Sequence, residues 1–488
     1  MAMDDDCTER GEMTRREYLK RSALGVSGLI AAPTILSSTA FGKSSPNDTI
    51  QVGQIGCGRI ARGHDLPETM KETEDVRIVA VSDVDRQRMK DGKALVEEWY
   101  AEETGKENYV DVQTYQDYRE MLAQSNIDAV IVSTPDHWHA QPVVEAALAG
   151  KDIYMQKPHS LTVREGRIMA DVLQHMGTVF QVGSQQRGTD PWPQFKRACE
   201  LVRNGRVGAL QRVDVGLPGD PSGGDPTPMP VPENLNYDMW LGRTSRKPYT
   251  QQRVHPQSDN VDERYSRPGW LRCEQFSAGM ITGWGAHHVD AAHWGMGTEY
   301  TGPVEIQAEA EFPKEGLWDV HGKFRVESQY ENGVTMIISN ELEQGVRFTG
   351  AEDWIHVSRG PAQVTASDPG SGDEEDAPLK ASTPSLLNSE IGPDELHLQG
   401  RESEEHHSNW VRKIKEQDPD TLAPAEVSHR STSACLLSHI AMKLPRTLHW
   451  DPANERFEDD DEANSMLSRP QRYPWGIDHI DDLELDGW

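Results

Sequence analysis

A short apolar segment that runs directly into a glycine-rich turn limits most strongly what this chain can fold into. Residues 50–55 predict a buried strand, and Gly56 to Ala61 follow the pattern Gly-x-Gly-x-x-Ala. The first glycine of such a turn permits a tight bend, the second lets the backbone approach a pyrophosphate, and the small third residue lets the next helix pack closely. The anion then faces the helix N-terminus. The pattern predicts a dinucleotide-binding turn in which Gly56, Gly58, Arg59 and Ile60 contact the cofactor.

A second predicted strand, residues 76–82, places Asp83 at its end, 22 residues after Ala61. A carboxylate there accepts hydrogen bonds from the adenosine ribose and disfavours a 2′-phosphate. We therefore expect NAD rather than NADP, although Arg86 and Arg88 leave NADP open. Asp83 could also cap the helix that begins near Arg86, and the two roles are compatible.

Strands and helices continue to alternate up to residue 182, which predicts a doubly wound parallel sheet with ligands at the carboxyl ends of its strands. Three loops at those ends carry polar side chains: 134–139, 156–159 and 183–187. The predicted strands are 129–133, 152–155 and 179–182, and the predicted helices lie near 115–123, 141–149 and 163–175. The cofactor candidates from these loops are Thr134, Pro135, His139, Gln156 and Gln185.

A change of pattern near Arg212 indicates a second domain. Alternating segments at 304–312, 320–330, 334–340 and 354–357 predict its strands, and 409–415 and 428–443 predict helices. The acidic stretch 366–393 is rich in Ser, Pro and Gly, which predicts a mobile insertion or a surface excursion. The proposed boundaries are a leader at 1–42, a nucleotide-binding domain at 50–185, a substrate domain at 186–452 and a solvated acidic tail at 453–488.

The first 42 residues have the features of a targeting signal. The segment Thr14 to Lys20 contains Arg15 and Arg16 and is followed by a modest apolar stretch from Ser22 to Leu36. This order is typical of a twin-arginine export signal, and the apolar stretch is short for a membrane span. An amphipathic surface helix is the alternative. We expect a protein exported in the folded state to the periplasm without stable membrane association.

Charge and cysteine content exclude several classes of partner. The chain of 488 residues has 80 acidic and 49 basic side chains, a formal net charge of -31. Such a surface repels phosphate backbones, so nucleic acid and anionic membranes are poor partners. The five cysteines have no metal-ligand spacing and are expected to be packed thiols.

Four motifs in this order resemble the glucose-fructose oxidoreductase / inositol dehydrogenase / MocA (Gfo/Idh/MocA) family. They are the Gly-x-Gly-x-x-Ala turn, the 134–139 loop, the pair Lys157-Pro158 and the segment Gly285 to Asp290. The resemblance covers roughly residues 50–452. It implies an α/β Rossmann domain followed by an α+β domain with a large open, mainly antiparallel sheet, and a homo-oligomer, either a dimer or a tetramer.

The resemblance also assigns roles to two residues. In the family pattern Lys157 lies beside the nicotinamide and the sugar within a Glu-Lys-Pro motif, and His287 ends an Asp-x-x-x-His motif. This chain has Gln156 and Gly283 at the two acidic positions. Hydride transfer needs a group that takes the hydroxyl proton, and Lys157 can do so if its pKa is lowered, with His287 holding the hydroxyl or relaying the proton.

Substrate contacts are expected in the second domain, where aromatic, Arg and His side chains suit a carbohydrate. The density of His287, His288, Asp290 and His293 also raises a metal site. Because the resemblance assigns His287 to substrate and Asp290 to hydrogen bonding near it, we expect no metal there. The substrate candidates are Tyr237, His255, Arg272, His288 and Asp290.

These inferences lead to one main hypothesis and two alternatives. The main one is an exported NAD-dependent oxidoreductase acting on a sugar or glycoside hydroxyl, in a redox-neutral cycle because no soluble nicotinamide pool exists outside the cytoplasm. The first alternative is an NAD-dependent glycoside hydrolase that oxidises C3, eliminates the aglycone, adds water and reduces the ketone. The second is a binding protein without catalysis, suggested by Gln156 and Gly283 and opposed by Lys157 and His287.

Overall fold

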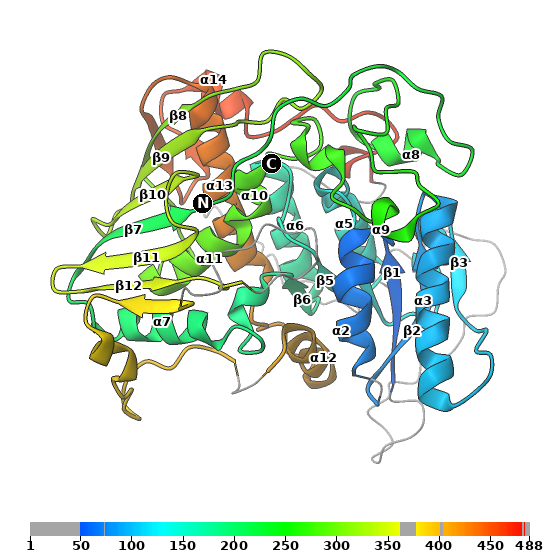
Figure 1. Ribbon diagram of the computed structural model, residues 1–488, viewed down its shortest axis with the longest axis horizontal. Coiled ribbons are helices and arrows are strands. Elements are labelled where there is room, and N and C mark those ends of the chain that lie inside the picture. The colour runs from blue at the N-terminus through cyan, green and yellow to red at the C-terminus, as the bar shows by residue number, and fades with distance from the viewer. Residues whose placement is uncertain (1–48, 73, 362–376, 401–403, 481–482, 484–488) are drawn as a thin grey trace, which may run out of the picture.

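A computed structural model describes residues 49–72, 74–361, 377–400, 404–480 and 483. Two sheets lie side by side with helices between and around them (Figure 1). The predicted export signal lies outside the described residues. Within them, no helix combines the length and the apolar character needed to cross a membrane.

The first sheet has six strands, all parallel, in the order β3-β2-β1-β4-β5-β6. The order reverses between β1 and β4, which is the place where doubly wound sheets bind ligands. The predicted Rossmann domain is therefore confirmed. Its strands are β1 (Ile50–Ile55), β2 (Val76–Ser82), β3 (Gln113–Tyr115), β4 (Ala129–Val132), β5 (Asp152–Met155) and β6 (Phe180–Val182).

Local signals set the ends of the longer helices. The Asp85 side chain caps α3 by accepting hydrogen bonds from two backbone N–H groups, and Gly105, with φ 63°, ends it. Thr162, whose side chain accepts one such hydrogen bond from Glu165, begins α6, and Gly177, with φ 63°, ends it. The helices of this part are η2 (Ala61–Asp65), α2 (Leu66–Met70), α3 (Arg86–Thr104), α4 (Tyr118–Leu122), η3 (Asp136–Trp138), α5 (Ala140–Leu148), α6 (Val163–Met176) and η4 (Gln185–Arg187).

The second sheet has nine strands in the order β13-β12-β11-β7-β10-β9-β8-β14-β15. Its pairings are antiparallel except β7 with β10. The expected open, mainly antiparallel sheet is confirmed. Its strands are β7 (Leu210–Gly216), β8 (Glu305–Ala310), β9 (Phe324–Gln329), β10 (Thr335–Ser339), β11 (Gly345–Gly350), β12 (Trp354–Val357), β13 (Leu379–Ala381), β14 (Leu448–Asp451) and β15 (Arg456–Phe457).

One face of this sheet is covered by helices whose apolar side chains form a common core with it. Phe348 of β11, for example, lies so close to α11 that a side chain at Gly295 would meet its ring at 2.4 Å. The helices of this part are α7 (Pro193–Arg203), α8 (Tyr237–Leu241), α9 (Val261–Arg264), η5 (Gly269–Arg272), α10 (Met280–Gly283), α11 (Gly285–Met296), η6 (Pro384–Asn388), α12 (His406–Glu416), α13 (Ala425–Lys443), α14 (Asp461–Ser465) and η7 (Ile477–His479).

The acidic stretch 366–393 is described by the structure only from residue 377. Residues 366–376 lie outside the described residues, but β13 pairs with β12 and extends the sheet by one strand. Lys380 of β13 also forms an ion pair with Glu343. Residues 379–381 of this half therefore form an edge strand of the sheet.

The C-terminal segments return to the first domain. Trp410 of α12 is fully buried in the core that includes Tyr154 of β5. Trp475 packs edge-on against Trp138, with ring centroids 5.5 Å apart, and Ile477 is fully buried. Trp475 and Ile477 thus belong to the first core, whereas the acidic residues Asp459, Asp461 and Asp478 around them are exposed.

Candidate active site

A cavity opens at the carboxyl ends of β1, β2, β4 and β5 and is closed by loops of the second domain. It joins the glycine turn at one end to Lys157 and His287 at the other. Of the predicted site residues, twelve line it: Gly56, Gly58, Arg59, Ile60, Asp83, Thr134, Pro135, Gln156, Lys157, Gln185, His255 and His287.

The glycine turn has the geometry that a pyrophosphate needs. Gly56 has φ +84°, and a Cβ there would lie 2.7 Å from the carbonyl oxygen of Ser133. A Cβ at Gly58 would have only the Arg88 guanidinium nearby, at 3.6 Å, so the space beside this backbone is open. The first turn of helix follows at Ala61. A backbone without side chains thus faces the cavity beside a helix N-terminus, and the residues present fit a dinucleotide.

Asp83 is buried at the same end and braces the turn. Its Oδ2 accepts a hydrogen bond from the backbone N–H of Cys57 at 2.7 Å, and its Oδ1 accepts one from Asp85 at 2.8 Å. Burial and the neighbouring Asp85 raise the pKa of Asp83 to about 6. A carboxylate oxygen has two lone pairs, so each can also accept from a ribose hydroxyl.

Lys157 follows β5 and reaches across the domain boundary. Its Nζ donates a hydrogen bond to the carbonyl oxygen of Gly283 at 2.7 Å. The backbone of α10 thus supplies an acceptor at the position where the family pattern has an aspartate. This contact fixes the ammonium group at the wall of the cavity.

His287 lies in the first turn of α11 and is 4% exposed. Burial, with Arg359 and Lys157 nearby, holds its pKa well below the usual range, so the ring is neutral. Its buried Nδ1 has no hydrogen-bond partner among the described residues. A neutral ring with an unsatisfied nitrogen is suited to bind a substrate hydroxyl.

Asp136 is a cavity residue that the sequence interpretation passed over. It directly follows Thr134-Pro135, is 4% exposed, and its Oδ2 has no hydrogen-bond partner within the described part of the chain. Burial raises its pKa to about 7, although Ser277 and Lys157 act in the opposite direction. Its position in the sequence could have indicated this, because an acidic side chain that follows a parallel strand lies at the edge of the sheet where ligands bind.

Four predicted substrate residues lie away from the cavity. Tyr237 donates to the Lys247 carbonyl at 3.0 Å, and the Arg272 guanidinium lies 4.5 Å from the ring centre of Trp318. The His288 Nδ1 is 3.0 Å from the Gly216 carbonyl oxygen. Tyr237, Arg272, His288 and Asp290 are therefore not among the residues that line the cavity, and their contact with substrate stays a prediction.

Asp290 stabilises the loop that follows β6. Its carboxylate accepts two hydrogen bonds from Arg187, at 2.6 and 2.9 Å, and one from Ser184 at 2.9 Å. This buried pair holds the loop that presents Gln185 to the cavity. His293 has its own partner, the Tyr330 hydroxyl at 2.7 Å.

His139 also supports the site from behind. Its two ring nitrogens lie 2.6 Å from the Pro158 carbonyl oxygen and 3.0 Å from that of Thr134. It ties the loop after β4 to the loop after β5, which is a positioning role, and its direct contact with the cofactor stays a prediction. His255 does line the cavity, with Nε2 2.9 Å from Asp85.

Aromatic and basic side chains complete the lining of the cavity. Trp284 packs edge-on against His287 and carries the Arg359 guanidinium 5.0 Å from its ring centre. Flat apolar faces beside forked donors suit the C–H and hydroxyl groups of a carbohydrate. The cavity residues of this kind include Trp138, Trp240, Trp270, Trp284, Arg267 and Arg359.

Comparison with known families agrees with this geometry. Residues 50–184 match the oxidoreductase family model with the NAD-binding Rossmann fold, and residues 224–353 and 391–477 match the model of the C-terminal alpha/beta domain of the same family. The chain belongs to the Gfo/Idh/MocA oxidoreductases. The resemblance inferred from the motifs is confirmed, and the first domain is an NAD-binding Rossmann domain.

Individual relatives of this Gfo/Idh/MocA chain match over shorter lengths. An inositol 2-dehydrogenase of Burkholderia multivorans is 30% identical over 163 residues, 33% of this chain and 43% of the relative. A glycosyl hydrolase family 109 protein of Solibacter usitatus is 31% identical over 157 residues, 31% of this chain and 34% of the relative. The chain thus matches less than half the length of these curated relatives.

Solved structures show the same fold over most of the chain. The WlbA dehydrogenase of Bordetella pertussis, crystallised with NADH and UDP-GlcNAcA, aligns with a TM-score of 0.56 at 16% identity. The alignment covers 83% of this chain and 99% of that one. Both sheets of this Gfo/Idh/MocA protein therefore have counterparts in a known dehydrogenase.

Proposed function

We propose that this protein is an exported NAD-dependent oxidoreductase that acts on a hydroxyl of a sugar or glycoside. One observation carries the proposal: a single cavity joins the Gly56 turn to Lys157, His287 and an aromatic wall. The inositol dehydrogenase relative and the WlbA dehydrogenase support a polyol or sugar substrate. Freshly purified protein is expected to contain or to titrate with NAD(H), and protein that neither contains nor binds it would exclude the proposal.

The residues of the cavity divide the work. NAD, when bound, supplies the hydride acceptor. Lys157 takes the hydroxyl proton on its Nζ and returns it in the reverse direction, which requires a fraction of neutral amine. His287, neutral and buried, holds the same hydroxyl through a ring nitrogen. The tryptophan faces exclude water from the reacting carbon.

The adenosine end favours NAD over NADP. Asp83 puts a carboxyl group where a 2′-phosphate would lie. Arg88 is 5% exposed and is already engaged, since it donates to the Arg264 carbonyl at 2.7 Å and lies 4.9 Å from the Tyr265 ring centre. It is therefore poorly placed to receive a phosphate.

Export carries a consequence for turnover. If the twin-arginine segment sends the folded protein to the periplasm, the nicotinamide stays bound and each cycle regenerates it. The reaction is then redox-neutral, with one sugar oxidised and another reduced. The strongly acidic surface suits such a setting, and the open sheet supports a homo-oligomer.

The family 109 relative and Asp136 favour a second candidate, a glycoside hydrolase that uses NAD catalytically. After oxidation at C3, the C2–H bond becomes acidic. A base removes that proton, the aglycone leaves from C1, water adds, and the ketone is reduced. Lys157 accepts the proton of the C3 hydroxyl, and Asp136 is the base that removes the C2 proton.

Chromogenic glycosides in D₂O separate the two candidates. The hydrolase releases the aglycone with catalytic NAD and leaves deuterium at C2 of the product. The sugar-to-sugar oxidoreductase releases no aglycone and incorporates no deuterium at C2, but interconverts two added sugars. If the protein shows neither activity with a broad panel of sugars and glycosides, the binding-protein alternative is favoured.

Replacing Asp136 with asparagine tests its raised pKa without knowledge of the substrate. The folded wild type holds a proton on Asp136 up to about pH 7, whereas the unfolded chain releases it near pH 4. This contribution to stability is therefore complete at low pH and is lost as the pH rises toward 7. The free energy of unfolding of Asp136→Asn, relative to wild type, is expected to increase between pH 4 and 7.

Denaturant titrations at several pH values measure this difference. A constant difference would show that Asp136 has an ordinary pKa. If Asp136 is the base in turnover, kcat/KM of the variant at pH 8 is also expected to fall by about 10²-fold.

A further inference from the structure

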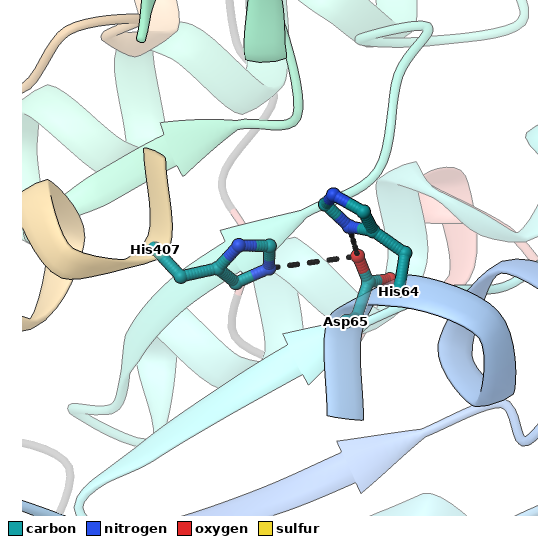
Figure 2. Close-up of side chains that lie close together, drawn as sticks. All are labelled: His64, Asp65 and His407. Atoms are coloured by element: carbon teal, nitrogen blue, oxygen red, sulfur yellow. Dashed lines mark hydrogen bonds and ion pairs between the residues drawn. The ribbon is translucent and has the colours of Figure 1, made fainter. Parts of the chain in front are cut away.

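Three side chains with metal-binding atoms converge behind the cavity, from two distant parts of the chain. His64 and Asp65 end the helical turn after the glycine loop, and His407 opens α12 (Figure 2). Their ligand atoms all lie within 4.8 Å of one another. We propose that His64, Asp65 and His407 form a binding site for one divalent transition-metal ion.

The distances suit a shared ion. Asp65 Oδ1 lies 3.2 Å from His64 Nδ1 and 3.5 Å from His407 Nε2. Zinc holds nitrogen and oxygen ligands at about 2.0–2.1 Å, so that donors around a tetrahedral ion are about 3.3 Å apart. Two imidazoles and one carboxylate are also a donor set that first-row divalent metals prefer. The ion takes its further ligand from water on the side of His64, which is 12% exposed.

His407 is oriented as metal-bound histidines are. Its Nδ1 lies 3.2 Å from Glu405 Oε1, and its ring stacks on Tyr154 with centroids 4.1 Å apart. A carboxylate on one ring nitrogen leaves the other for the metal. That other atom, Nε2, is buried and has no hydrogen-bond partner among the described residues, and it faces Asp65 (Figure 2).

Asp65 is held in place from the cavity side. Its Oδ1 accepts a hydrogen bond from Gln156 at 2.7 Å, and its Oδ2 accepts one from Ser133 at 2.6 Å. Both donors also line the cavity. Gln156 therefore connects the proposed metal site to the wall of the nicotinamide pocket.

The charge balance favours a cation. Two carboxylates flank the His407 ring: Asp65 Oδ1 lies 3.5 Å from Nε2 and Glu405 Oε1 lies 3.2 Å from Nδ1. Asp65 is fully buried, so its charge needs a partner. A divalent ion bonded to Nε2 would be balanced by these two carboxylates, and any proton on Nε2 leaves to water.

The position of the site indicates a structural role. The ion would join the π-helical turn after β1, a form of helix frequent at functional sites, to α12. It would thereby clip a C-terminal helix onto the nucleotide-binding domain without touching the reacting atoms.

Metal analysis of the full chain tests the proposal. Protein stripped with a chelator and dialysed is titrated with ZnCl₂, and metal per chain is measured after gel filtration. We expect one Zn²⁺ per chain and a higher Tm in the loaded protein. Replacement by Co²⁺ should give the visible absorption of an ion with nitrogen and oxygen ligands. Wild type that retains no Zn²⁺ would overturn the proposal and leave a buried ion-pair cluster.

Three variants locate the site. His407→Gln and His64→Asn are expected to weaken Zn²⁺ binding by at least about tenfold. The control is His406→Gln, a neighbouring buried histidine whose Nδ1 faces the Tyr154 hydroxyl at 3.1 Å. It should bind Zn²⁺ as wild type does. Unchanged binding in His64→Asn, the variant at the partly exposed ligand and so the least disruptive one, would also overturn the proposal.

Discussion

Replacing Lys157 with methionine is expected to lower kcat by a factor of about 10²–10⁴, the usual contribution of a positioned acid or base. Methionine keeps the length of the side chain but cannot take a proton or donate to Gly283. Lys157→Arg should be nearly as inactive, because a guanidinium stays protonated. The affinity for NAD should change much less. The measurement is turnover with the sugar or chromogenic glycoside that wild type accepts, together with an NAD titration.

Lys151 provides a matched control at the other end of the same strand. It is 9% exposed, and its Nζ donates to the Ile127 carbonyl at 2.7 Å, outside the cavity. Lys151→Met is expected to retain kcat per folded molecule even if its Tm falls. Wild-type turnover in Lys157→Met, or an equal loss in Lys151→Met, would remove Lys157 from the reaction.

Replacing Gly56 with alanine should cost both stability and cofactor binding. An L-residue at φ +84° is strained, and its Cβ would lie 2.7 Å from the Ser133 carbonyl oxygen, a backbone atom that cannot move alone. We expect the free energy of unfolding to fall by about 1–3 kcal/mol. The turn must shift, so the affinity for NAD should fall by more than about tenfold.

Gly105 separates the two effects. It has φ +63° at the end of α3, but a Cβ there would have nothing within 4 Å. Gly105→Ala should therefore lose about 1 kcal/mol through backbone strain alone and bind NAD as wild type does. Calorimetric titration with NAD of both variants measures the difference. Equal NAD affinity in Gly56→Ala and wild type would contradict the role assigned to the turn.

The sequence predicted those parts of the fold and site that depend on local patterns. Continuous apolar strands, the Gly56 turn and the polar loops after β4 and β5 can be read without a partner segment. Because parallel strands end at one edge, Asp83, Thr134 and Lys157 were correctly expected in one place. Strand β11 was not predicted, since its six residues begin and end with glycine.

The substrate residues were harder, because their positions depend on packing between elements. His287 and Asp290 share α11, yet one faces the cavity and the other pairs with Arg187. No periodicity shows which face of a fully buried helix meets the ligand. The pairing of Asp65 with His407 likewise joins segments far apart in sequence, so that no local motif signals it.

Because α12 and Trp475 pack against the first sheet, the first domain cannot complete its core from its own segment alone. The side chains of Tyr154 and His406, 252 residues apart in sequence, are in contact. Trp138 likewise packs against Trp475. Because these contacts join segments far apart in sequence, the core of the nucleotide-binding domain is complete only after residues 406–477 have been synthesised. A chain that stops before α12 is therefore expected to lack part of the core of its nucleotide-binding domain.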